Sequence, residues 1–550
     1  MRKPLLYLLI VAAVVTTSCE KDFDPKIYGV FTSTNYPGSA SDYQTLMMTC
    51  YTPFTTPWTY YLGASRANQH PWYIPEGGVL KHFEYTSDTM APWEIGVWSQ
   101  NYRYLSQANF NLTVYYVRDY LHADNPNHYP KTREVTRFTE IIGILQDAPE
   151  SVLSEPVKNE LLGEARLCRG LHMYNLLHTY GPVPLITDPA DVSNTEKLTI
   201  AVRPPLNEIS QWIYDDFDFA VKNVAESQAE KGRYTADYAR VCLMRHCLNE
   251  GYHMDGWYRK ATELFTELDN GKYSLFLQGT NPYAEMFREA NDFNCEIIMA
   301  VSCDPSSTGN SREGNMNPFM MLAVPENAAK KDDLGNPTPF SIMGAGWGQT
   351  YNLSPKFFDT FEPGDKRAET IVTSYYTTGG VWIRPQDIGT KWDGYIVNKF
   401  PAETPTAPCW GNDIPLARWA DVLLMSAEAE VRMTKSAPSQ TAIDAVNAVR
   451  ARAGLSGLPA AATGSAEKFL DALLTERGHE LFYEGIRKID LIRFNQYAQR
   501  CKKCKGTIPT HQYLPIPNYA VDEAEALGKE LDQTWSREGW SEDYAAAKKL

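Results

Sequence analysis

Three short stretches carry the residue types of catalytic or metal-binding motifs, and each lacks something that the motif requires. Gly63–Ala67 fails the GxSxG nucleophile elbow because its last residue is alanine. In His479–Tyr483 a tyrosine stands where the zinc motif HExxH needs its second histidine. Cys501 and Cys504 have the CxxC spacing of a metal site or a disulfide, but no second CxxC or pair of histidines accompanies them. The sequence therefore predicts no catalytic residue, no metal and no cofactor.

Cys19 has the setting of a lipid-acceptor residue. The eleven-residue apolar run Leu5–Val15 follows Arg2 and Lys3. It is too short to cross a bilayer, which takes roughly 17 to 25 residues, and it has the regions of a secretory signal peptide. Thr16–Cys19 resembles a bacterial lipobox. We expect cleavage before Cys19 and acylation of its thiol, and two or three acyl chains hold a protein stably on a membrane.

The composition of the rest of the chain is that of a folded globular protein. Hydrophobic content is 43% and charged content is 22%, as in globular proteins. Without the signal peptide, 50 basic and 67 acidic residues remain, a net charge of -17 that argues against nucleic acid as a partner. We expect a signal peptide at 1–18, a lipidated tether at 19–40 and one domain at 41–550, whose only link to the membrane is the lipid.

Two blocks of helical periodicity supply the scaffold that must position any site. In residues 95–275 and again in 416–500, apolar side chains recur at intervals of three and four. Clear cases are Leu206–Val224, Trp257–Leu268 and Ala442–Ala453. Successive short helices with brief connections predict helix pairs that stack on one another. The predicted fold class is therefore mainly α.

Some helix ends can also be predicted. Apolar residues cover much of Asn159–Tyr180, which predicts a largely buried helix that ends at Gly181. Gly454 is the expected stop of another helix, and Ser465 is the expected N-cap of the next one.

Residues 276–415, between the two blocks, have a different character. Turn-forming pairs such as Asn-Pro, Gly-Asn and Gly-Gly recur there. Thr370–Thr373 and Gly394–Val397 are short β-prone pieces among them. We predict a loop-rich insertion with short strands, and Cys50–Trp93 has the same irregular character.

Side chains in these two irregular regions are the candidate ligand contacts. A pyranose stacks its C–H face on an exposed aromatic ring, while its hydroxyls take hydrogen bonds from polar groups around that ring. Tryptophans at helical spacing, such as Trp98, Trp212 and Trp257, are assigned to the core instead. The candidates are Arg66, Asn68, Trp72, Trp93, Phe319, Trp347, Tyr351, Trp382 and Trp392.

Four longer stretches together are similar to the hallmark segments of the SusD/RagB outer-membrane lipoproteins. They are His178–Ile186, Arg418–Ala429, Glu476–Phe494 and Tyr513–Pro517, and they occur in the family's order after the lipobox. Glu20–Asp24 also resembles the acidic export signal of Bacteroidetes surface lipoproteins. The resemblance implies tetratricopeptide-like helix pairs, a lipid-anchored position on the outer membrane facing the exterior, no catalysis, and a SusC-like TonB-dependent transporter as partner.

Charged residues in Glu476–Phe494 recur at helix-like intervals. We predict that they form ion pairs between adjacent helices, because acid–base catalysis needs two carboxylates that face one cleft about 5 to 10 Å apart. The residues concerned are Arg477, Glu480, Glu484, Arg487, Asp490 and Arg493.

The resulting hypothesis is a cell-surface protein that binds oligosaccharide or polysaccharide and delivers it to the transporter. One alternative is a RagB-like lid that captures peptides, which favours a deep cleft that contacts backbone amides. The other is a glycoside hydrolase, since Asp and Glu are abundant. The sequence does not identify the sugar.

Overall fold

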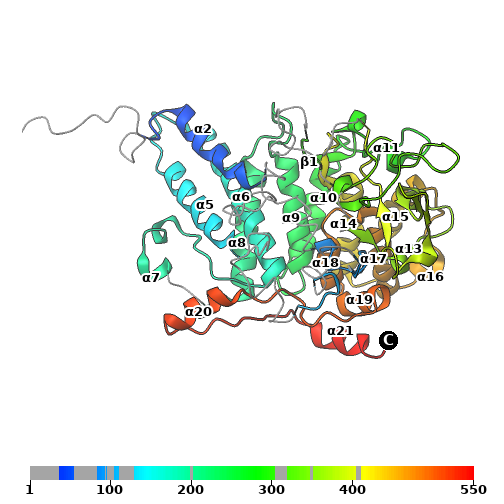
Figure 1. The fold of residues 1–550 in the computed structure, drawn as a ribbon. Coiled ribbons are helices and arrows are strands. Elements are labelled where there is room, and N and C mark those ends of the chain that lie inside the picture. The colour runs from blue at the N-terminus through cyan, green and yellow to red at the C-terminus, as the bar shows by residue number, and fades with distance from the viewer. Residues whose placement is uncertain are drawn as a thin grey trace, which may run out of the picture. The chain divides into compact units, whose positions relative to one another are not determined.

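The computed structural model describes residues 36–54, 83–92, 94–95, 105–110, 129, 131–198, 202–303, 317, 319–346, 351–403 and 411–550 (Figure 1). The predicted signal peptide and Cys19 lie outside these ranges. The chain divides into two units, Met1–Leu46 and Met47–Leu550, and each is described by itself. Helix α2 (Ala40–Met48) begins in the first unit, where the Asp42 carboxylate accepts hydrogen bonds from the amides of Gly38 and Ser39.

The first block of the second unit is a row of antiparallel helices. After the 3-10 turn η1 (Thr49–Phe54) come α5 (Lys131–Gln146), α6 (Glu155–Tyr180), η4 (Pro189–Asp191), α7 (Thr195–Leu198), α8 (Leu206–Asn223), α9 (Ala236–Glu250) and α10 (Trp257–Leu268). Helix α6 packs on α5 and α8, and α9 packs on α8 and α10, so each long helix lies beside its neighbours in the chain (Figure 1). The predicted stacking of helix pairs is confirmed.

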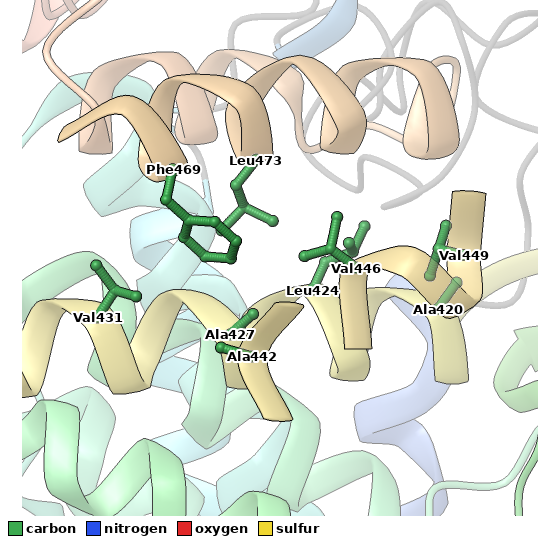
Figure 2. Packing of buried hydrophobic residues seen from close by; sticks show 9 residues of the cluster. All are labelled: Ala420, Leu424, Ala427, Val431, Ala442, Val446, Val449, Phe469 and Leu473. Atoms are coloured by element: carbon green, nitrogen blue, oxygen red, sulfur yellow. The ribbon is translucent and has the colours of Figure 1, made fainter. Parts of the chain in front are cut away.

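The second block continues this row from the other side of the insertion. Its elements are α14 (Trp419–Thr434), α15 (Gln440–Arg452), α16 (Ala460–Thr463), α17 (Ala466–Leu481), α18 (Arg487–Arg493), α19 (Tyr497–Lys505), α20 (Asn518–Ala526) and α21 (Trp540–Ala547). Helix α14 packs on α10, α15 and α17. Figure 2 shows the core between α14, α15 and α17, where Leu424, Val446, Phe469 and Leu473 meet.

Capping residues end or begin these helices where the sequence predicts. Gly181 follows α6 with φ of 75°, and a Cβ there would lie 2.4 Å from the ring of Trp535, so both backbone and space require glycine. The Ser465 hydroxyl accepts a hydrogen bond from the Lys468 amide and caps α17. Gly454 follows α15 with φ of 82°. These predictions are confirmed.

Short strands and turns make up the insertion. Its elements are α11 (Pro282–Glu285), η5 (Glu289–Asn291), β1 (Ile297–Val301), α12 (Phe319–Ala323), β2 (Asn352–Leu353), α13 (Pro355–Phe358), η7 (Lys366–Thr370), β3 (Ile371–Val372), β4 (Tyr375–Tyr376), β5 (Trp382–Ile383), η8 (Pro385–Asp387), β6 (Tyr395–Val397) and β7 (Ile414–Arg418). Strands β1 and β7 pair antiparallel and bring the two ends of the insertion together. The two β-prone pieces are β3 and β6, which pair with each other in a sheet of order β2-β6-β3.

Buried ion pairs join the hallmark segments across these elements. Arg477 on α17 binds Asp421 on α14 and Asp490 on α18, each at 2.8 Å. Arg493 binds Glu428 at 2.7 Å, and these side chains are almost wholly buried. Burial alone would raise the pKa of Asp421, but Arg477 and Arg245 lower it to about 2. The predicted ion pairing between helices is confirmed for Arg477, Glu480, Asp490 and Arg493. It is wrong for Glu484 and Arg487, which pair with residues outside the helices.

The other two hallmark segments also contact each other. The Leu514 amide donates to the carbonyl of Thr179 at 2.8 Å, and the ring of Tyr513 lies 5.0 Å from that of Trp535. Trp535 covers Gly181, as described above. The segment after α6 is therefore held by the chain that follows α19.

Candidate functional site

The predicted ligand contacts fall into three groups. Arg66, Asn68, Trp72, Trp93 and Trp347 lie outside the described residues, and their role stays a prediction. Phe319, Tyr351 and Trp392 are buried. Trp382 is half-buried on strand β5.

The three buried rings are packed against other protein side chains. Phe319 lies 5.1 Å from Phe400 and 5.4 Å from Tyr483, ring centre to ring centre. Tyr351 packs against Tyr85 at 5.3 Å. Burial of these rings counts against direct stacking with a sugar.

Trp392 shows why composition alone misplaces such residues. It is wholly buried, its ring lies 5.5 Å from that of Tyr375, and its indole Nε1 donates to the Arg384 carbonyl at 3.0 Å. A tryptophan with a satisfied indole N–H beneath a hairpin is a packing residue. Its position in a Gly- and Asp-rich stretch of the sequence gives no sign of that burial.

The half-buried Trp382 forms an outward pair with Tyr376. The two residues are directly opposite each other in the β4–β5 hairpin, and their ring centres are 5.3 Å apart with planes tilted by 58°. Both rings are half-buried, while Tyr375 and Ile383 on the other face of the hairpin are buried. The sequence analysis missed Tyr376. The Gly379-Gly380 turn between the two strands is the signal that would have paired it with Trp382.

Two adjoining cavities lie where the two irregular regions join the scaffold. One, of about 70 Å³, is lined by Phe83 and Phe319, and the other, of about 160 Å³, by Phe54 and Ser302. Leu416 on β7 lines both. Phe54 and Phe83 flank residues 55–82, while Ser302 and Phe319 stand just outside residues 304–316. The described residues on either side of these two stretches therefore border the same pair of cavities.

Aromatic and polar groups line the larger cavity. Arg233 binds the buried Glu164 through two hydrogen bonds of 2.7 and 2.9 Å, and the Tyr51 hydroxyl donates to the same carboxylate at 2.5 Å. The Lys231 ammonium lies 5.3 Å from the ring centre of Phe293 and forms no ion pair within the described part of the chain. The wall of this cavity therefore holds aromatic rings, the Ser302 hydroxyl and the Lys231 ammonium, whereas the Tyr51 hydroxyl is already bound to Glu164. The sequence analysis singled out none of these residues.

Glu484 lines the smaller cavity and is bonded to Arg418 and Lys399, while Glu230 lines the larger one and lies 3.5 Å from Arg233. Two further carboxylates, in the insertion, are occupied by backbone groups. Asp413 accepts from the Cys303 amide at 2.8 Å, and Asp292 accepts from the Asp413 amide at 3.0 Å. Burial raises the pKa of Asp413 to about 6; burial and the nearby Asp413 raise that of Asp292 to about 7. Neither residue lines the two cavities. The geometry is that of carboxylates that hold loops.

The CxxC stretch lies on helix α19. Both thiols are free and buried, and burial raises the pKa of Cys504 to about 12. Within the ranges given above, no group of three or more His, Cys, Asp or Glu side chains is placed to hold a metal ion. The same ranges contain no helix that is both long enough and apolar enough to cross a membrane.

The stacked helix pairs, together with an insertion whose two ends are joined by the β1–β7 pairing, define a helical-repeat protein with a loop-rich insertion. The family model described as the SusD family matches residues 295–525. A SusD-like protein from Bacteroides ovatus is 30% identical over 181 residues, which are 31% of this chain and 31% of that protein. SusD-like protein P25 from Formosa agariphila is 23% identical over 398 residues, which are 66% of this chain and 71% of that protein.

Solved structures share the fold over most of the chain. A laminarin-binding SusD-like protein matches with a TM-score of 0.67 and 21% identity, over 90% of this chain and 99% of that one. Surface glycan-binding protein A from Bacteroides fluxus matches with a TM-score of 0.67 and 20% identity, again over 90% and 99%.

The chain is therefore similar to SusD-family proteins in sequence over residues 295–525, and it shares their fold over the greater part of its length. The resemblance to the SusD/RagB family and the predicted fold class, a mainly α scaffold of tetratricopeptide-like helix pairs, are both confirmed.

Proposed function

We propose that this protein binds oligosaccharide at the cell surface and delivers it, uncleaved, to a SusC-like TonB-dependent transporter in the outer membrane. The observation that carries the proposal is the outward Tyr376–Trp382 pair on a SusD-like scaffold. Sugars stack on such rings. Two proteins of this fold support the ligand class, the laminarin-binding protein and surface glycan-binding protein A of Bacteroides thetaiotaomicron in complex with laminarihexaose.

The hairpin holds its two rings in a fixed relation. The Thr377 amide donates to the Val381 carbonyl at 2.9 Å, and the Ala329 amide donates to the Tyr376 carbonyl at 2.8 Å. A rigid platform loses little conformational entropy when a ligand binds.

A glycan-array screen of the intact protein, followed by long incubation with any retained glycan, separates the three functional hypotheses. Retention without new reducing ends supports a binder. Release of shorter products indicates a glycoside hydrolase, and retention of peptides alone indicates a RagB-like lid. Glu484, the carboxylate that lines the smaller cavity, favours the binder over the hydrolase, because the side chains of Arg418 and Lys399 already occupy it.

Trp382→Ala and Tyr376→Ala are each expected to weaken binding of a retained oligosaccharide. Loss of one aromatic stacking contact is worth about 0.5–1.5 kcal/mol, which corresponds to roughly two- to twelvefold in Kd. Isothermal titration calorimetry measures the change in Kd. Tyr544→Ala is the matched control, since this half-buried ring lies on α21, and it should leave Kd unchanged. Equal affinity in all three variants would exclude the hairpin from the site.

Cys19→Ala is expected to abolish membrane anchoring and to lower glycan uptake, because the acyl chains are the proposed attachment. Glycan binding by the purified variant should equal that of the unmodified protein. Cell fractionation and an uptake assay check the two halves of this prediction. Unchanged uptake by the variant would contradict the proposed anchored delivery.

A further inference from the structure

Residues 83–92 run as a strap through the interior of the second unit. In the chain they stand between the candidate contacts Trp72 and Trp93. Most of the strap is wholly buried. Helix α19 donates hydrogen bonds to the backbone of the strap. The Tyr85 carbonyl accepts from the Lys505 ammonium at 2.6 Å, and the Thr86 carbonyl accepts from the Tyr497 hydroxyl at 2.9 Å.

Two acidic side chains fasten the strap to the third hallmark segment. Asp88 binds the Arg487 guanidinium through two hydrogen bonds of 2.8 and 2.9 Å. Glu84 accepts three backbone amides on one oxygen, those of Gly485 at 3.1 Å and of Ile486 and Arg487 at 3.3 Å. Its other oxygen accepts from the Thr89 hydroxyl at 2.9 Å. Residues about 400 positions apart are thereby joined.

Glu84 has an unusual electrostatic position. Its side chain is wholly buried, and the nearby Arg487 guanidinium is used by Asp88 and by the Leu474 carbonyl. Throughout the described ranges, no lysine or arginine forms an ion pair with Glu84. A buried carboxylate that has only neutral donors is costly when ionised.

We propose that protonation of Glu84 controls how tightly the strap docks on helices α18 and α19, and that docking is tightest in mildly acidic surroundings. Docking rests on the hydrogen bonds of Glu84 and Asp88 described above.

The direction of the effect follows from proton linkage. Burial raises the pKa of Glu84 from an ordinary 4.5 to about 7, against the opposing effects of Thr89 and Arg487. The docked strap therefore binds a proton more readily than the released one between pH 4.5 and 7. Docking must weaken as the pH rises through that window and level off above it, with a slope of up to about tenfold per pH unit.

The other titratable groups around the strap act in other pH windows or in the same direction. Burial lowers the pKa of Lys488 to about 7 and that of Lys505 to about 8, so these lysines affect docking above pH 7. Burial raises the pKa of Tyr483 and Cys501 above their ordinary values. Asp393 accepts from the Ile95 amide, just beyond the strap, and burial raises its pKa to about 6. Asp393 therefore adds to the slope below pH 6.

Hydrogen–deuterium exchange of the intact protein without ligand tests the proposal. Exchange in the peptides covering 83–92 and 485–487 is measured from pH 5 to 7.5 and corrected for the intrinsic rate. In the unmodified protein, protection should fall by up to about tenfold per pH unit to pH 7. In Glu84→Gln, which stays neutral and still accepts the amides, protection should vary much less. Glu94→Gln changes an exposed carboxylate next to the strap and should behave as the unmodified protein.

Two results would overturn the proposal: a flat pH profile in the unmodified protein, or an unchanged slope in Glu84→Gln. The first needs no variant, so it decides the matter even where the substitution prevents folding. Because no ligand is present, the outcome is separate from that of the glycan screen. Failure to bind any glycan, laminarihexaose included, with the slope intact would count against the proposed function alone.

Discussion

Replacing Glu480 with glutamine should lower the free energy of unfolding by about 3–5 kcal/mol, the usual cost of removing one partner from a buried ion pair. The carboxylate contacts Arg418 at 2.9 Å and Arg367 at 3.3 Å, and it also pairs with Arg452. All four side chains are wholly buried. The change leaves three guanidinium groups short of a counter-charge and loosens α17 from both the insertion and α15.

The midpoint of urea unfolding, followed by circular dichroism, measures this loss. Glu467→Gln is the matched control, since it makes the same change on an exposed position of α17 and should stay within about 0.5 kcal/mol. A Glu480→Gln midpoint equal to that of the control would show that the network contributes nothing to stability.

A second buried cluster of ion pairs, around Arg477 and Arg493, predicts how stability depends on acid. Burial alone would raise the pKa of Glu428, but Arg493 and Arg432 lower it from 4.5 to about 2, and Asp421 is lowered in the same way. A carboxylate with a lowered pKa stabilises the fold above its unfolded pKa. This stabilisation is therefore complete above about pH 5 and is lost as the pH falls towards 2.

Phe469→Ala should cost about 3–5 kcal/mol as well, through loss of apolar burial and the cavity that remains. The ring is wholly buried and lies in the core that α14, α15 and α17 share (Figure 2). Three helices converge there, so the core cannot close around the gap without moving one of them. Urea unfolding again measures the change.

Leu470→Ala is the matched control for this position, because Leu470 only packs on the edge of the same core and is partly buried. It should cost clearly less than Phe469→Ala. Equal losses in the two variants would mean that the described core does not distinguish its centre from its edge.

Periodicity was sufficient to predict the scaffold. Long amphipathic helices such as α8 and α10 bury one face, and that requirement is written in residues three and four positions apart. The stops at Gly181 and Gly454 were predictable because a left-handed backbone favours glycine. Arg477, Asp490 and Arg493 were predictable as ion pairs between helices for the same reason, since their spacing placed them on helix faces.

The candidate site was less accessible to sequence reasoning. Phe319, Tyr351, Trp382 and Trp392 look alike in the sequence as aromatic residues in an irregular region, yet only Trp382 keeps part of its ring exposed. Whether a ring packs inward depends on contacts with distant residues, such as that of Tyr351 with Tyr85. No spacing rule reports such contacts.

The sequence by itself determined the helical scaffold and the resemblance to the SusD/RagB family, because these depend on residues that are close together or in a set order. Only the tertiary structure decided that Tyr376 is the partner of Trp382 and that the two irregular regions join the scaffold at adjoining cavities. The tertiary structure also decided that the Glu84 carboxylate accepts hydrogen bonds from the backbone amides of 485–487. The physical reason is that burial and long-range hydrogen bonds are set by how the chain folds back on itself.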